Sequence, residues 1–328
     1  MQTNCKMIEL YKLKYRIERY LQLIPYYGII GSFQIDSILK KIQSTADVYE
    51  KAKLLDKRHQ MALDYIENNL SQFRSKPFES CKPVRRDLSD KNIWVFWAQG
   101  EKSMPPLVKA CYNSILQNAN GHRVILIDMK NLEQYLTIAP VTLSRIGKSM
   151  SYTFFSDYLR LNLLTYYGGL YIDSTYLVTA PINENILKGP FFSIHKDIKE
   201  SEFVSKSRWT GNLIYAPSKT DYMQNIRNMY CEFREHNNNP FEYFLIDYCF
   251  HYEYKHNNTF KYLIDAIPYS NSCSFKLQKH INDPFDKNLW DNWLKDTSFF
   301  KMSYKGVFKT VKNSQETFYG YILRKYAE

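Results

Sequence analysis

Two carboxylates and one arginine lie close together between residues 154 and 179 of this sequence. Asp157 and Arg160 are three residues apart on a predicted helix, so their side chains project from the same side. Asp173 comes shortly afterwards. Carboxylates can bind sugar hydroxyls or a divalent cation, and an arginine can neutralise a diphosphate on which charge is growing. From spacing alone, a simpler interpretation is favoured, which is an ion pair of little energetic value on an exposed helix surface.

The elements around these residues decide whether they can meet. The pattern predicts a helix over 154–167, because Gly168 and Gly169 follow it as glycines do beyond a helix C-terminus. A short strand over 170–172 comes next and ends at Asp173. Ligands of open α/β sheets bind outside the carboxyl ends of the strands. The strand would therefore place Asp173 at the edge of the sheet where ligands bind, and the helix would lie beside it.

The upstream region predicts the parallel sheet that this argument needs. Residues 92–97 (NIWVFW) form a short apolar run that is typical of a buried strand. A helix over 107–117 and a second strand over 123–127 complete a strand–helix–strand unit. The expected fold class is therefore α/β, with a single Rossmann-type mixed sheet and flanking helices. Weaker patterns predict further elements: a turn and strand at 209–216, a helix at 242–251 and a hairpin near 305–306.

The N-terminal quarter has a different pattern. Helical periodicity extends over residues 1–75, with a break at 28–32, and a Pro-containing charged stretch over 75–90 is typical of a linker. We therefore expect two parts: a helical N-terminal extension over 1–86 and an α/β domain over 87–328.

Composition excludes several classes of protein. The chain has 328 residues, of which 45% are hydrophobic, enough for a sizeable core. Its six cysteines are scattered without a CxxC pair, which argues against a zinc site or a disulfide framework: Cys5, Cys81, Cys111, Cys231, Cys249 and Cys273. The N-terminus has no apolar run long enough for a signal peptide or a spanning helix, so we expect a cytoplasmic protein.

The positive charge is concentrated at one end. Residues 1–86 hold 16 Lys and Arg against 9 Asp and Glu, a net charge of +7 out of +11 for the chain. Such a segment could contact an anionic membrane face or a phosphorylated substrate, or it could be a solvated helical surface. A nucleic-acid partner would rest on charge alone, since no motif supports it, and we expect none.

Four segments in order resemble a known family. They are IWVFWAQGEKSMPPLVKACYNSI, SDYLRLNLLTYYGGLYIDST, WTGNLIYAP and the YFL segment at 243–245. The second resembles the sugar-binding region with a DXD motif of glycosyltransferase family 32 and of the clostridial glucosylating toxins. The whole set, spanning roughly residues 90–310, is most similar to the bacterial capsular polysaccharide synthesis proteins.

The resemblance implies a GT-A-like fold and a hexosyltransferase. The donor would be a nucleotide sugar, most simply a UDP-sugar, and the acceptor a cell-surface or capsular polysaccharide, which could be lipid-linked. Retention of the anomeric configuration is expected by analogy with the related families. A lipid-linked acceptor would suit a peripheral position on the inner membrane face. The alternative is a catalytically silent protein of the same fold that binds a nucleotide sugar or a glycan.

The resemblance also implies roles for individual residues. Asp157 and Asp173 would orient the sugar and a cation, and Arg160 would bind sugar or diphosphate. Together with Glu242, which stands before the YFL segment as a candidate acceptor-side carboxylate, they form the predicted catalytic set. Asp247 is a second candidate for the acceptor side.

Further positions would complete the binding of the donor. Trp97 would stack on the nucleotide base, and Asp128, at the end of the second strand, would contact the nucleoside. Asn212, in the WTGN turn, would reach a sugar. Lys305 is a candidate contact of the diphosphate.

One departure concerns the metal. The third position of the DXD motif is Thr175 rather than aspartate. The resemblance implies Mn²⁺ or Mg²⁺ on Asp173 and Thr175, but threonine is a poor ligand for either ion. Either waters and the diphosphate complete the site, or another residue does, or the cation is dispensable.

Overall fold

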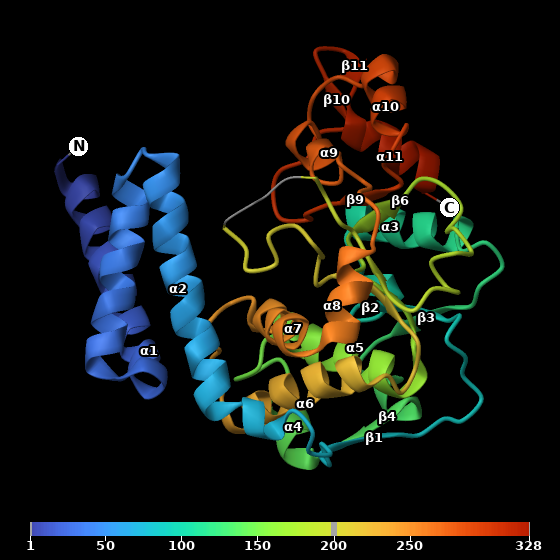
Figure 1. The fold of residues 1–328 in the computed structure, drawn as a ribbon. Coiled ribbons are helices and arrows are strands. Elements are labelled where there is room, and N and C mark those ends of the chain that lie inside the picture. The colour runs from blue at the N-terminus through green and yellow to red at the C-terminus, as the bar shows by residue number, and fades with distance from the viewer. Residues whose placement is uncertain (1, 198–201, 328) are drawn as a thin grey trace.

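The computed structural model describes residues 2–197 and 202–327 (Figure 1). Within the first helix it describes side chains only from residue 14 onward, so the side chain of Cys5 is not among the described ones. The N-terminal elements are α1 (Gln2–Ser44), α2 (Val48–Asn69) and β1 (Cys81–Pro83). The central elements are β2 (Ile93–Phe96), α3 (Pro106–Gln117), β3 (Val124–Ile127), β4 (Leu136–Ile138), α4 (Pro140–Arg145), α5 (Tyr152–Tyr167), β5 (Gly169–Ile172), β6 (Tyr176–Val178), β7 (Phe192–Ser193) and β8 (Leu213–Ala216). The C-terminal elements are α6 (Asp221–His236), α7 (Leu245–His256), α8 (Asn258–Asp265), α9 (Lys276–Lys279), α10 (Lys287–Trp293), β9 (Phe299–Lys301), β10 (Val311–Lys312), β11 (Gln315–Glu316) and α11 (Phe318–Tyr326).

A five-stranded mixed sheet forms the centre of the molecule, in the order β3-β2-β5-β8-β7. Strand β2 runs parallel to both β3 and β5. Strand β8 runs antiparallel to both β5 and β7. The predicted α/β fold with a mixed sheet and a helical N-terminus is therefore confirmed.

The strand order creates a switch point in the sheet. The chain leaves β2 through α3 and returns as β3 on one side of β2, and it later returns as β5 on the other side. The connections thus diverge at the carboxyl ends of β2 and β5, where open α/β sheets bind their ligands. Trp97 follows β2 directly, and Asp173 follows β5 directly.

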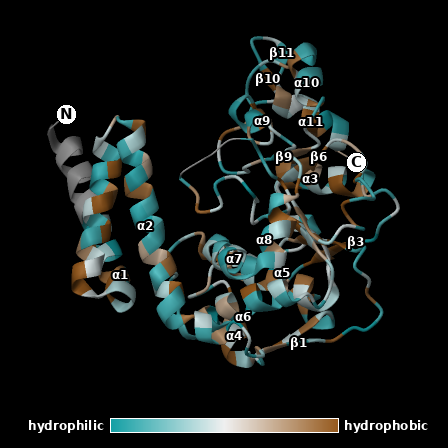
Figure 2. Ribbon diagram, viewed as in Figure 1, coloured by the Kyte–Doolittle hydropathy of each residue, from teal (hydrophilic) through white to brown (hydrophobic). Residues whose placement is uncertain are grey.

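Helices cover both faces of the sheet. On one face, side chains such as Trp94 and Tyr171 pack with α5, α6 and α7. On the other face, their strand neighbours, such as Val95 and Leu170, pack against α3. Figure 2 shows brown and teal residues alternating along α1 and α2, as expected of amphipathic helices at the edge of a larger body.

Both N-terminal helices contact this body: Tyr26 of α1 packs against Phe233 of α6, and α2 contributes to the core. Gly28 interrupts α1 with φ 66° and ψ 179°, which confirms the predicted break. In α2, Ala62 and Ile66 are fully buried in the same core as the sheet. The predicted division at residue 86 stays a prediction, although α2 shares the core of the α/β part. None of the described helices is long and apolar enough to cross a bilayer.

Some elements differ from those predicted. The expected linker contains β1, which pairs with β4 so that Cys81 faces Ile138. The hairpin near 305–306 was predicted wrongly, because the turn lies between β10 and β11 and pairs Val311 with Glu316. These strands of two or three residues are too short to show periodicity.

Two glycines make the reversal from α5 into β5. Ser151 begins α5 by accepting a hydrogen bond from the amide of Phe154, and Gly168 ends it. Gly168 and Gly169 have φ of +66° and +102°, a region that favours glycine. A Cβ on Gly169 would lie 2.4 Å from the carbonyl oxygen of Asn92. The backbone of β5 therefore approaches its neighbour as closely as only a glycine allows, and this fixes α5 relative to Asp173.

We predict that Gly169→Ala will lower the free energy of unfolding by about 3 kcal/mol or more, because it adds a backbone clash to an unfavourable φ. Gly121→Ala is the matched control, since Gly121 also has positive φ (+78°) but no atom within 4 Å of the added Cβ. That control should cost roughly 1–2 kcal/mol. Urea unfolding of both variants provides the comparison, and equal losses would contradict the close-approach argument.

Candidate functional site

A cleft of about 690 Å³ opens at the switch point of the sheet. Eight of the predicted site residues line it. Asp247 and Lys305 are two of these, and the other six are Trp97, Asp157, Arg160, Asp173, Thr175 and Asn212. These six come from the ends of β2 and β5, from α5 and from the turn before β8. Asp128 and Glu242 are not among its lining residues.

Arg160 lies at the base of the cleft rather than on an exposed helix surface, and only 4% of it is exposed. Its Nη1 lies 3.2 Å from Oδ1 of Asp157 and also donates to the carbonyl oxygen of Gly211. Its Nη2 donates to Oγ of Ser156 at 3.1 Å, and the guanidinium lies 4.6 Å from the ring centre of Tyr171. The pair is thus part of a buried network, and the surface-pair interpretation does not hold.

Burial and charge act in opposite directions on this pair. Burial by itself would lower the pKa of Arg160, but Asp157, Tyr171 and Asp173 together outweigh it, so the pKa is raised and the guanidinium stays protonated. Burial raises the pKa of Asp157, while Arg160 opposes the rise and Asp173 adds to it. Asp157 also accepts a hydrogen bond from the hydroxyl of Tyr230 at 3.4 Å. The network holds this carboxylate at one position in the wall of the cleft.

Asp173 is paired with a lysine that the sequence did not point to. Nζ of Lys301 lies 2.6 Å from Oδ2 of Asp173 and also donates to the hydroxyl of Thr175. Lys301 belongs to β9, which pairs with β6 so that Lys301 faces Tyr176. Burial would raise the pKa of Asp173, but Lys301 and then Arg160 outweigh it, so the pKa is held below its ordinary value. Asp173 is therefore ionised.

This arrangement tests the predicted metal site. Asp173 and Thr175 are the residues that would hold Mn²⁺ or Mg²⁺, and the ammonium of Lys301 lies between them. Across residues 2–197 and 202–327, no cluster of three or more His, Cys, Asp or Glu side chains is arranged to hold a metal ion. A single carboxylate, one hydroxyl and a cation do not make a ligand set for a divalent ion. As arranged, these residues do not fit it.

The two tryptophans of the first strand region lie in different surroundings. Trp94 is buried, and its Nε1 donates to the carbonyl of Gly168 at 2.7 Å. Trp97 lines the cleft and meets the ring of Tyr304 edge-to-face, with centroids 5.4 Å apart. Its buried Nε1 has no hydrogen-bond partner within the described part of the chain. A planar ring at the rim of a cleft can stack on a nucleotide base.

Asn212 links the two sides of the cleft. Its backbone carbonyl accepts from the amide of Asp173 at 3.0 Å, in the pairing of β8 with β5. Its side-chain Oδ1 accepts from the hydroxyl of Tyr176 at 2.8 Å. The amide group of the same side chain can donate to a ligand hydroxyl.

Two predicted residues serve the fold elsewhere. The carboxylate of Asp128 accepts from the amides of Lys130 and Asn131 at 2.8 and 2.9 Å, which closes the turn after β3. Glu242 is buried and forms a two-pronged ion pair with Arg58 of α2. The structure brings neither residue to the cleft.

Asp247, near the start of α7, lines the cleft where Glu242 does not. Its Oδ1 accepts from Nε1 of Trp209 at 2.9 Å, and 8% of the residue is exposed. Burial raises the pKa of Asp247 to about 7, with Trp209 opposing the rise and the charge of Asp157 adding to it. A carboxyl with this pKa can change its protonation state near neutral pH.

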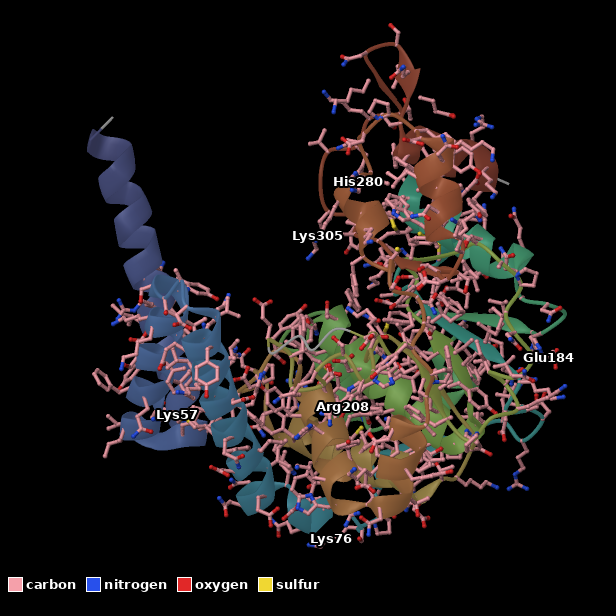
Figure 3. The ribbon with its side chains drawn as sticks, turned by 45° about the horizontal axis from the view of Figure 1, so that its top comes forward. Lys57, Lys76, Glu184, Arg208, His280 and Lys305 are labelled. Carbon is pink, nitrogen blue, oxygen red and sulfur yellow. The ribbon has the colours of Figure 1, made fainter. Side chains whose placement is uncertain are left out.

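Lysines complete the opposite wall. Lys301 lies deep, with 17% of its side chain exposed. Lys305 extends into solvent from the C-terminal segment at the mouth of the cleft (Figure 3). The sequence suggested Lys305 but gave no signal for Lys301, because only the pairing of β9 with β6 brings residue 301 beside residue 173.

A family model described as capsular polysaccharide synthesis protein matches residues 42–322. The chain belongs to this family. The match includes α2 and every residue that lines the cleft, and it places the protein in capsular polysaccharide biosynthesis. Comparison with curated proteins and with solved structures gave no match.

The pKa of Asp247 predicts a pH-dependent stability. The folded protein keeps the Asp247 proton up to about pH 7, whereas the unfolded chain releases it near pH 4. The wild type should therefore lose stability relative to Asp247→Asn as the pH rises through this interval, by roughly 4 kcal/mol in total. Urea unfolding at several pH values measures this difference. Asp291→Asn, on the exposed face of α10, is the control, and parallel wild-type and Asp247→Asn curves would refute the prediction.

Proposed function

We propose that this chain is a glycosyltransferase of the GT-A type, related to family 32, that transfers a hexose from a UDP-sugar to a growing capsular polysaccharide. One observation carries the proposal: Trp97, Asp157 and Asp173 converge on a single cleft at the switch point of the sheet. Nucleotides bind at this point in open α/β sheets. Membership of the capsule synthesis family supplies the biological setting.

The cleft offers a group for each part of the donor. Trp97 stacks on the base at the end of β2, and the carboxylates of Asp157 and Asp173 bind hydroxyls of the sugar. Arg160 already donates to Asp157 and to backbone and hydroxyl oxygens, so it orients this wall more than it binds ligand. Its buried Nε has no hydrogen-bond partner in the described residues.

The reaction breaks the bond between the anomeric carbon and a diphosphate oxygen, which keeps the electron pair. A new bond joins the anomeric carbon to the oxygen of the acceptor hydroxyl. For the retaining outcome that we propose, the proton of that hydroxyl passes to the departing diphosphate. Positive charge grows on the sugar ring as the bond breaks, as in glycoside hydrolysis. Asp247 takes the acceptor-side role that was predicted for Glu242, because only Asp247 lines the cleft.

A second candidate is a protein that binds a nucleotide sugar or a glycan without turnover. Its support is the replacement of an aspartate by Thr175 and the ion pair that engages Asp173. Release of labelled sugar from a bound donor separates the two candidates, since a silent protein binds the donor and returns it unchanged.

We expect a UDP-sugar to raise the melting temperature of the wild type, because a ligand that binds only the folded state stabilises it. Asp173→Asn should abolish most of that shift, and Asp291→Asn should preserve it. A thermal-shift panel of nucleotides and nucleotide sugars tests this and names the donor class. Failure of every nucleotide to shift the wild type would remove the proposed donor site.

The proposal extends to the N-terminal helices. Ile29, Ile30 and Phe33 follow the break at Gly28 and are exposed by 68, 76 and 65%. Exposed apolar side chains on a segment with an excess of basic residues are typical of helices that lie on an anionic membrane. A lipid-linked acceptor would then be presented at the inner membrane face.

Co-sedimentation with phosphatidylglycerol vesicles tests this extension. The wild type should pellet with anionic vesicles at low salt and release at high salt, while vesicles of phosphatidylcholine should bind it weakly. Ile30→Ser combined with Phe33→Ser should reduce binding several-fold, because two inserted apolar groups are lost. The variant Val311→Ser, exposed at the far end of the chain, is the control. Equal pelleting of all three proteins would contradict the membrane contact of this surface.

A further inference from the structure

We propose that the ammonium of Lys301 is the permanent cation of the donor site, taking the place of a divalent metal and binding the diphosphate directly. The inference rests on the proposed nucleotide-sugar site and says how that site neutralises its ligand. The observation behind it is that one nitrogen bridges the first and third positions of the Asp-x-Thr motif, Asp173 and Thr175.

The lysine is held in place by its strand. Lys301 is the last residue of β9, whose pairing with β6 sets it opposite Tyr176. Its amide donates to the carbonyl of Ser274 at 2.8 Å, and the next amide, that of Met302, donates to the carbonyl of Thr175 at 2.9 Å. Backbone hydrogen bonds on both sides therefore fix the Cα of Lys301 beside the motif. Its ammonium is held close to Asp173 and Thr175 as a result.

The ammonium has one donor left for a ligand. A lysine carries three N–H groups. Two of them are accounted for by the carboxylate of Asp173 and the hydroxyl of Thr175. The structure assigns no oxygen or nitrogen acceptor to the third within residues 2–197 and 202–327, although the ammonium also lies 5.4 Å from the ring centre of Tyr176. Lys301 lines the cleft. A phosphate oxygen is the kind of acceptor that a charged donor binds most strongly.

Threonine suits this arrangement better than aspartate would. With one carboxylate at Asp173, the ion pair with Lys301 is neutral, and Asp157 is balanced by Arg160. A second carboxylate at position 175 would leave the ligand-free site with a net negative charge, which a divalent metal would have to neutralise. A hydroxyl accepts the lysine's hydrogen bond without adding that charge. The residue that makes the motif a poor metal site thus makes it a good lysine site.

A divalent ion would also have to displace the lysine. It would need the oxygen of Asp173 that already lies 2.6 Å from Nζ. Two like-charged centres cannot share that oxygen in a partly buried cleft without strong repulsion. Lys305, at the mouth of the same cleft, adds a second positive charge that an incoming diphosphate meets first.

Calorimetric titration with UDP tests the inference, in buffer with EDTA and in buffer with Mn²⁺. We expect the wild type to bind UDP with the same affinity in both buffers. Lys301→Gln should weaken binding about tenfold or more in both, because a charge-assisted hydrogen bond is lost. Lys287→Gln removes one positive charge from the exposed surface of α10 and should leave the affinity unchanged. Thermal unfolding without ligand shows that each variant is folded.

A second variant tests metal binding at the site in the absence of nucleotide. Lys301→Glu would place another carboxylate beside Asp173, so it should gain binding of Mn²⁺ alone, whereas the wild type should bind Mn²⁺ weakly or not at all. Titration of Mn²⁺ followed by electron paramagnetic resonance measures both.

The outcomes separate the inference from the proposed function. UDP binding that disappears in EDTA, or micromolar Mn²⁺ binding by the wild type, would overturn the lysine's role and leave the nucleotide site intact. UDP binding that Lys301→Gln does not weaken would do the same. A wild type that binds UDP in neither buffer would overturn both, even though its Mn²⁺ titration would still report whether the motif holds a metal.

Discussion

The close contact between the backbones of Gly169 and Asn92 is the constraint on which the site depends. It allows α5 to reverse directly into β5 with almost no connecting loop, and it presses β5 against β2. Asp157, on the helix, and Asp173, at the end of the strand, then face one cleft. A longer connection would let the two elements slide and would separate the carboxylates from each other. The rest of the site is built outward from this fixed pair of elements.

The second requirement is a cation for each carboxylate. Arg160 comes from the same helix as Asp157, one turn away, so the pair forms as soon as α5 does. Lys301 reaches Asp173 from a strand that follows more than a hundred residues later. The first pair is local and the second is made by tertiary structure alone. The cleft therefore becomes electrically balanced only when the C-terminal segment has docked on β6.

This difference explains what the sequence could and could not predict. The strands at 93–96, 124–127 and 169–172 were found because their apolar runs and flanking glycines are local signals. That Asp157 and Asp173 would meet followed from the rule for strand ends, whereas Trp97 was placed beside them by the family resemblance. Lys301 was missed because no sequence pattern near residue 301 indicates a contact with residue 173. Glu242 was selected by its place in a motif. No local pattern could indicate that it forms an ion pair with Arg58 of α2.

The ion pair between Arg58 and Glu242 has a consequence for how the molecule can be divided. Glu242 directly precedes Tyr243 and Phe244, which line the cleft, so α2 anchors one side of the cleft through a buried charge. A fragment that began after α2 would deprive this glutamate of its counter-ion, and removing one partner of a buried ion pair is strongly destabilising. The smallest piece of the chain with an intact pocket should therefore include α2, in agreement with a family match that begins at residue 42. Helix α2 is therefore a structural support of the cleft and not a separate extension of the chain.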